Sequence, residues 1–227
     1  MPSRPGFWTA AAAIVWKDLA VEWRSRQLIV SLLVFALLVI LIFNFALDLD
    51  ALARAEISAG VLWATFAFAG TLGFNRSMAI EKDREALDGL LLAPVDRGAI
   101  YIGKLLANFL FLVILQILTL PIYAVLYNVN VFQPGLLAVM ALGALGYVAI
   151  GTLLAAMAVQ ARTRELLLPV LLLPLALPLL IAAVRASSGF LDGLAMEYIV
   201  PSLNLLLAYT AIMLALGYMF FEYVVEE

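Results

Sequence analysis

Two groups of residues in this sequence have the types and spacing that chemistry at a site requires. The first runs from Gly98 to Gly103 and Lys104, with the G-x-x-x-x-G-K spacing of a phosphate-binding loop. The next residue is Leu105, however, where such a loop needs a serine or threonine to hold Mg²⁺, and no strand is expected before the run. The sequence therefore argues against a nucleotide site in this chain.

The second group is a set of four closely spaced carboxylates: Glu81, Asp83, Glu85 and Asp88. Carboxylates along a helix can share a hard cation. Lys82 and Arg84 alternate with them, however, and alternating charges are typical of a solvated helix face, which is the interpretation we favour. Because the sequence contains no cysteine and no histidine, we expect neither a metal site nor an enzyme.

The composition indicates the kind of scaffold that carries these residues. Of the 227 residues, 66% are hydrophobic and 13% are charged, whereas soluble domains are about 45–50% apolar and about 25% charged. Six apolar runs have about the 20 residues that a helix needs to cross a bilayer. They are 27–47, 57–74, 105–127, 135–159, 166–184 and 199–221. The sequence predicts an all-α integral membrane protein, with residues 1–227 in a single transmembrane domain.

The distribution of charge predicts the orientation of these spans. Lysine and arginine concentrate in cytoplasmic loops. With six spans, 11 of the 13 basic residues fall on one side, and only Arg54 and Arg185 fall on the other. Both termini and the loop 75–104 should therefore be cytoplasmic. No charged residue lies in the middle of a span, which argues against an ion-driven transporter.

Two further patterns concern individual helices. Residues 7–26 predict an amphipathic helix. Its apolar face would carry Trp8, Ala12, Val15, Leu19 and Trp23, and its polar face Lys17, Asp18, Glu22 and Arg24. Tryptophans suit the membrane interface, although a plain helical lead-in to the first span fits the pattern as well. In the fifth span, Pro169, Pro174 and Pro178 predict a kink or a locally unwound turn.

The loop 75–104 contains a second amphipathic segment. Its apolar residues and the carboxylates opposite them include Leu87, Leu90, Leu91, Glu85 and Asp88. Pro94 should end this helix, because a proline disfavours helical conformation in the residue before it. Asp96 can then cap the next helix. A short helix that projects leucines into the cytoplasm either fits a groove on a partner or packs on the membrane surface or on the chain itself.

These loop residues resemble a known motif. Residues 85–94, followed by Arg97 and by Gly103 and Lys104, are similar to a run in the membrane domains of type-2 ABC exporters. The wider sequence resembles the CcmB family, the membrane subunits of haem-exporter-type ABC complexes in cytochrome c maturation. The segments that carry this wider resemblance are 60–63, 68–73, 75–77, 151–157, 166–169 and 221–227.

The resemblance implies a half-transporter in the bacterial inner membrane, two copies of which pair with two cytoplasmic ATPase subunits. Residues 84–92 would be the coupling helix, and residues 7–26 an interfacial connecting helix. The residues expected to contact the ATPase are Leu87, Leu90 and Leu91 in its groove, with Glu85, Asp88, Pro94 and Arg97 beside them.

The resemblance also implies cofactors and partners. ATP would be bound by the partner subunit, haem would be handled by the complex, and a further membrane protein would handle haem; no nucleic acid is expected. Haem iron is normally held by His, Cys, Met or Tyr, so a chain without His or Cys should bind no cofactor alone. The expected function is ATP-driven haem export or release of haem to a periplasmic chaperone. A type-2 exporter of a glycan, lipid or drug, and a scaffold that recruits a soluble partner without transport, remain alternatives.

Overall fold

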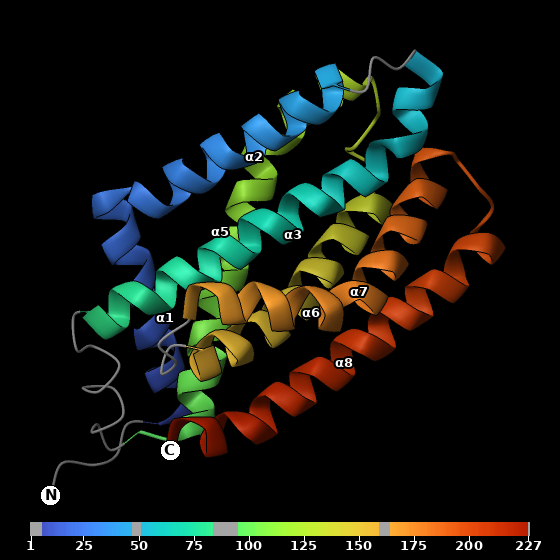
Figure 1. Cartoon of the computed structure of the whole chain (residues 1–227). Helices are drawn as coiled ribbons and strands as arrows, with labels where there is room; N and C mark the ends of the chain where they lie inside the picture. The colour runs from blue at the N-terminus through green and yellow to red at the C-terminus, as the bar shows by residue number, and fades with distance from the viewer. Residues whose placement is uncertain (1–5, 47–50, 84–94, 159–163, 227) are drawn as a thin grey trace, which may run out of the picture.

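The structure, a computed structural model, describes residues 6–46, 51–83, 95–158 and 164–226. These residues form helices and contain no strand (Figure 1). The helices are α1 (Phe7–Ser25), α2 (Gln27–Ala46), α3 (Ala51–Asp83), α5 (Arg97–Tyr127), α6 (Pro134–Ala158), α7 (Arg164–Leu191) and α8 (Met196–Glu226). All except α1 are long and apolar enough to cross a membrane. The predicted all-α fold with six spans is confirmed.

The helices are mostly longer than the predicted spans, because several of them continue past the apolar residues. At the predicted loop 75–104, α3 continues to Asp83 and α5 begins at Arg97, so both ends of that loop are helical. The fifth apolar run lies in α7, which is helical from Arg164 to Leu191. The locally unwound turn predicted from its three prolines is therefore wrong.

One end of the bundle gathers most of the described basic residues, and we call it the basic end. Here α1 lies across the bundle, α3 and α8 end, and α5 begins (Figure 1). The described basic residues at this end include Lys17, Arg24, Arg26, Arg76, Arg97 and Lys104. Arg54, in the first turn of α3, and Arg185, near the end of α7, lie toward the opposite end. The structure thus sorts these residues as the sequence predicts.

The core of the bundle is built around α6. Within its membrane-crossing part 67% of residues are buried, the same share as in its neighbour α3, compared with 28% for α2, which lies along one edge in Figure 1. Close approach to α6 depends on glycines: the place where a Cβ of Gly143 would lie is occupied by the ring of Trp63, and that of Gly151 by the ring of Phe74. Large aromatic side chains of α3 therefore pack directly on the α6 backbone.

Polar side chains in this core are hydrogen-bonded between helices. The indole Nε1 of Trp63 donates to Ser187 Oγ of α7 at 2.9 Å. The Tyr147 hydroxyl of α6 donates to the carbonyl of Ala67 at 2.7 Å and lies 2.6 Å from Thr71 Oγ1. Because a bilayer offers no water to an unpaired polar group, such pairing is what allows these residues to be buried.

Candidate functional site

The predicted partner-binding residues lie at the basic end, and the structure describes one of the seven. Arg97 is the first residue of α5. The other six, Glu85, Leu87, Asp88, Leu90, Leu91 and Pro94, lie outside the described residues. The carboxylate of Asp96 accepts a hydrogen bond from the Gly98 amide at 2.7 Å, so the predicted cap of α5 is confirmed. Asp83 and Arg97, which bound this segment, both lie at the basic end.

A polar hollow opens beside the start of α5. It measures about 290 Å³ and is lined by residues 95–98 together with Tyr218 and Glu222 from the last turns of α8. α5 and α8 meet closely here, because a Cβ on Gly98 would lie only 2.6 Å from the Tyr218 ring. The first turn of α5, which follows residues 84–94 in the sequence, is therefore packed against α8.

The second glycine of the G-x-x-x-x-G-K run lets α1 lie directly on α5. A Cβ on Gly103 would be 2.8 Å from Cβ of Ile14 and 3.1 Å from the carbonyl oxygen of Ala11. Any larger residue at position 103 would force the two helices apart, and Ile14, being β-branched, has little freedom to move away.

The lysine of the same run anchors α1 electrostatically. The Lys104 side chain is 1% exposed, and its Nζ donates to Oδ2 of Asp18 at 2.8 Å. Oδ1 of Asp18 lies 3.1 Å from Nζ of Lys17, so this carboxylate joins a lysine of α1 to a lysine of α5. Residues 98–104 are helical, and Lys104 is committed to Asp18. The run is thus a helix-packing motif.

Helix α1 presents three faces rather than the two that its sequence predicts: one with exposed tryptophans, one that packs on the bundle, and one with the exposed Arg24. The indole rings of Trp8, Trp16 and Trp23 point outward and are 72%, 76% and 80% exposed. The side that meets the bundle carries the buried Ala11, Ile14 and Glu22, with Asp18 between them. The predicted single polar face is therefore wrong: Arg24 is exposed, whereas Asp18 and Glu22 turn toward the protein.

The joint between α1 and α2 is also held by a carboxylate. Oε1 of Glu22 accepts the backbone N–H of Ile29 at 2.8 Å, which satisfies one of the free amides in the first turn of α2. Only Arg26 separates the two helices, and it has the left-handed conformation, with φ 53°. Its N–H returns to the Glu22 carbonyl at 2.6 Å. Glu22 thus fixes the direction in which α2 leaves α1.

Three residues of this arrangement were absent from the predicted site: Asp18, Glu22 and Lys104. The available signal was the spacing of two carboxylates four residues apart on a mostly apolar helix. No group of three or more His, Cys, Asp or Glu residues could hold a metal ion within the described ranges. The predicted carboxylate set cannot be placed, because the side chains at 81–88 fall outside those ranges.

Comparison with known proteins gives a consistent answer along the chain. Residues 9–225 match the family described as CcmB protein. The protein named heme exporter protein B from Rhodobacter capsulatus is 31% identical over 186 residues, covering 82% of this chain and 85% of that protein. Its namesake from Bradyrhizobium diazoefficiens is 26% identical over 186 residues, covering 82% and 84%. The one from Paracoccus denitrificans is 30% identical over 176 residues, covering 77% and 80%.

Proposed function

The chain belongs to the CcmB family, and from this membership we propose that it is the membrane subunit of an ABC transporter that exports haem. The observation that carries the proposal is the family match over residues 9–225, which takes in nearly all of α1 and all six membrane-crossing helices. The proposed substrate comes from the name that the relatives carry, heme exporter protein B.

In this proposal the basic end faces the cytoplasm of a bacterium, and the protein lies in its inner membrane. The support is the sorting of basic residues described above, since lysine and arginine are retained on the cytoplasmic side during insertion. The outward indoles of Trp8, Trp16 and Trp23 fit this orientation, because α1 would then lie at the cytoplasmic interface with these rings at the headgroup level.

ATP hydrolysis would be supplied by a separate subunit that grips the segment 84–92. Leu87, Leu90 and Leu91 would fill its groove, and Glu85, Asp88, Pro94 and Arg97 would lie at the rim. The structure supports this role through the ends of the segment: it is bounded by two long helices, α3 and α5, that run back into the membrane. A push on the segment would therefore act on two membrane-crossing helices at once.

The contacts of α5 suggest how such a push would spread. The Lys104–Asp18 pair and the close approach at Gly103 make α1 follow the start of α5. Glu22, one turn after Asp18, holds the first turn of α2. Movement at the cytoplasmic end would thus reach α2 through α1, although α2 and the coupling segment are far apart in the sequence.

The partners and cofactors of the proposal follow from the same role. ATP would bind to two copies of the ATPase subunit, and two copies of this chain would form the membrane part. With no histidine and no cysteine in this sequence, haem iron would be ligated by another membrane subunit, and the ATPase cycle would release haem to a periplasmic chaperone. This chain would then transmit motion and hold no cofactor by itself.

The test is complementation of a strain that lacks this gene. Leu90→Asp should abolish co-purification with the ATPase and covalent haem attachment to secreted c-type cytochromes, because a carboxylate cannot be buried in an apolar groove. Leu194→Asp is the matched control: Leu194 is exposed at the opposite end of the bundle, so that variant should keep both activities.

Two results would overturn the proposal in different ways. If haem attachment is normal in the deletion strain, the substrate is not haem, and a type-2 exporter of another molecule is favoured. If a catalytically dead ATPase restores haem attachment as well as the active enzyme does, the chain is a scaffold and does not couple ATP hydrolysis to export.

A further inference from the structure

Among the described residues, the buried polar atoms without a partner lie on α2, α3 and α5. In the part of the chain that the structure describes, three buried side-chain atoms have no hydrogen-bond partner: Oδ1 of Asn44, Oγ of Ser58 and Nε2 of Gln116. They belong to α2, α3 and α5, one on each helix. An unpaired polar atom inside a membrane protein is costly, because no lipid group can replace the missing partner. The contact among these three helices is therefore incompletely satisfied.

In the half of this contact that lies away from the basic end, two of these atoms flank a pair of tyrosines. The rings of Tyr123 and Tyr127 on α5 stack with their centroids 4.4 Å apart. The Tyr123 hydroxyl donates to the Ser58 carbonyl, and the Tyr127 hydroxyl lies 3.4 Å from the carbonyl of Ile40. Asn44 follows Ile40 by one helical turn. We call Asn44, Ser58, Tyr123 and Tyr127 the outer seam.

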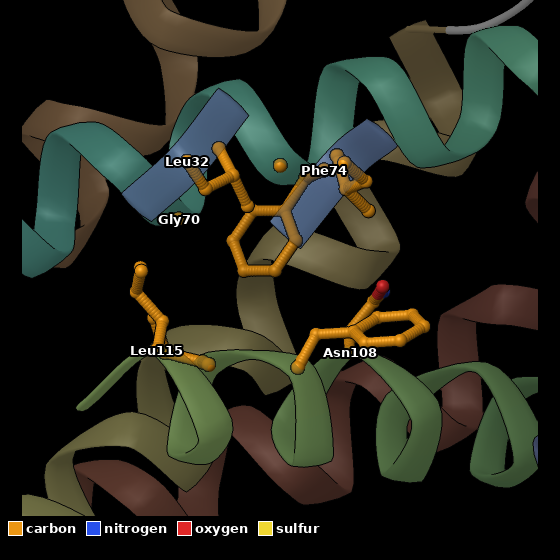
Figure 2. Close-up of a pocket in the computed structure, with 9 residues that line it drawn as sticks. Leu32, Gly70, Phe74, Asn108 and Leu115 are labelled. Carbon is orange, nitrogen blue, oxygen red and sulfur yellow. The ribbon is translucent and has the colours of Figure 1, made fainter. Parts of the chain in front are cut away.

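In the other half, the same three helices enclose a small apolar cavity of about 20 Å³ (Figure 2). Its lining comes from Leu28 and Leu32 of α2, from Gly70, Gly73 and Phe74 of α3, and from Asn108, Phe111, Leu112 and Leu115 of α5. We call it the inner pocket. A cavity of this size removes packing contacts without holding more than about one small group. Side chains of α2 therefore rest on α3 with space left between them.

The two halves together single out α2 as the helix that can shift. Where α2 meets α3, Leu32 lies over Gly73, which has no side chain to interlock with it, and Cδ1 of Leu32 would be 3.1 Å from a Cβ at that position. At its start, α2 is joined to α1 through Glu22, while Leu28 and Leu32 pack into the core beside the inner pocket. In its far half, α2 packs Ile40 into the core and brings Asn44 to the incompletely paired polar groups of the outer seam.

We propose that the outer seam is a water-binding site that opens when α2 shifts away from α3 and α5 over the inner pocket. Water entering from the end opposite the basic end would donate to Asn44 Oδ1 and exchange a hydrogen bond with Ser58 Oγ. Water is the ligand that fits, because the site offers isolated hydrogen-bonding atoms and no charge. The seam would hydrate each time α2 moves, whether the movement is thermal or driven by a partner.

The natural absence of cysteine makes this testable in the full chain in native membranes. Ser58→Cys and Ser187→Cys are matched single-thiol variants: both serines are buried, at 1% and 0% exposure. They differ in that Ser187 Oγ accepts a hydrogen bond from Trp63, whereas Ser58 Oγ has no partner. A thiol reacts as the thiolate, which forms only where water reaches it.

The reagent is a small, membrane-impermeant methanethiosulfonate, and the readout is the rate of labelling. The thiol at position 58 should react about tenfold faster or more, although Ser187 lies nearer a helix end. Equal rates, or faster labelling at position 187, would overturn the proposal. Because the measurement needs neither ATP nor haem, it is independent of the function proposed above.

A disulfide across the inner pocket tests the movement itself. Leu32→Cys with Gly73→Cys would lock α2 to α3, and Gly146→Cys with Thr210→Cys would lock α6 to α8, where the two Cβ positions are 3.3 Å apart. Each pair is oxidised before position 58 is labelled. The first lock should slow labelling at position 58 about tenfold, and the second should leave it unchanged. If both locks slow labelling equally, or neither does, α2 is not the moving helix.

Discussion

Buried polar groups around α6 are hydrogen-bonded between helices, whereas two of those around α2 have an atom without a partner. Around α6, aromatic rings fill the places of missing glycine side chains, and Trp63 and Tyr147 find partners on other helices. Around α2, a small cavity lies between the helices in one half, and Asn44 Oδ1 and Ser58 Oγ lack partners in the other. Since burial in a membrane makes every unpaired polar atom costly, this difference indicates which contacts hold the bundle together and which can part.

The α1–α5 contact belongs with the satisfied region, and breaking it should have the largest effect. Lys104→Met leaves the Asp18 carboxylate without its buried partner, so we expect a loss of about 3 kcal/mol in the free energy of unfolding. Denaturant titration of the protein in detergent micelles measures this. Lys17→Met is the control, because Lys17 pairs with the same carboxylate from a solvent-exposed position and should cost little.

The buried charge of Asp18, rather than the lost packing of the Lys104 side chain, should cause most of this destabilisation. Adding Asp18→Asn to Lys104→Met should therefore recover part of the lost stability, because it removes a carboxylate that has lost its buried partner and keeps only the more exposed Lys17. A double variant as unstable as the sum of the two single variants would show that the pair contributes nothing beyond packing.

The next largest effect is expected where α6 meets α3. Gly143→Ala puts a methyl group into the space occupied by the Trp63 ring, which Ser187 holds in place, so we expect a loss of about 1–3 kcal/mol. In Gly60→Ala, also in a membrane-crossing helix, a Cβ would meet nothing within 4 Å, and no loss is expected. The same titration compares the two variants. A Gly143→Ala protein as stable as the Gly60→Ala protein would show that the α6 core is not tightly packed.

The sequence predicted the parts of this fold that depend on local composition. The six membrane-crossing helices, the sorting of lysine and arginine, and the Asp96 cap of α5 each follow from nearby residues. The role of Lys104 does not, because its partner Asp18 lies 86 residues away and both side chains look like ordinary flanking charges. The direction in which α1 turns its carboxylates has the same origin: it is set by the contact with α5 rather than by the periodicity of α1.

The seam residues show a second kind of limit. Asn44, Asn108 and Gln116 are similar in sequence, since each is an uncharged polar residue within an apolar run. Asn108 donates to Thr152 of α6 at 3.0 Å, whereas Asn44 Oδ1 and Gln116 Nε2 have no partner. Whether such a residue is hydrogen-bonded or unpaired depends on how helices that are distant in the sequence pack together, which the local sequence does not reveal. The predicted coupling residues between 84 and 94 stay a prediction.

A smaller effect is expected from a single hydroxyl in the α6 core. Tyr147→Phe removes the donor to the Ala67 carbonyl and leaves Thr71 Oγ1 with only its bond to the same carbonyl. The expected loss in unfolding free energy is about 1–2 kcal/mol. Thermal unfolding in detergent, followed by tryptophan fluorescence, measures the change. An unchanged midpoint of thermal unfolding would show that hydrogen bonding of Tyr147 does not stabilise the core, so that the core and the outer seam would not differ in this respect.

The smallest effect is expected at the seam, and there its sign is informative. Ser58→Ala deletes a buried hydroxyl that has no partner and leaves in place the carbonyl that accepts from Tyr123, so stability should be unchanged or rise by up to about 1 kcal/mol. Ser187→Ala, an identical change on α7, leaves the Trp63 indole unpaired and should cost about 1 kcal/mol. The same denaturant titration should therefore give changes in unfolding free energy of opposite sign for the two variants, because Ser187 is hydrogen-bonded in the core and the Ser58 hydroxyl is unpaired at the seam. A Ser58→Ala protein that is destabilised as much as Ser187→Ala would mean that water already satisfies the seam while α2 is packed, so that no movement of α2 is needed to admit it.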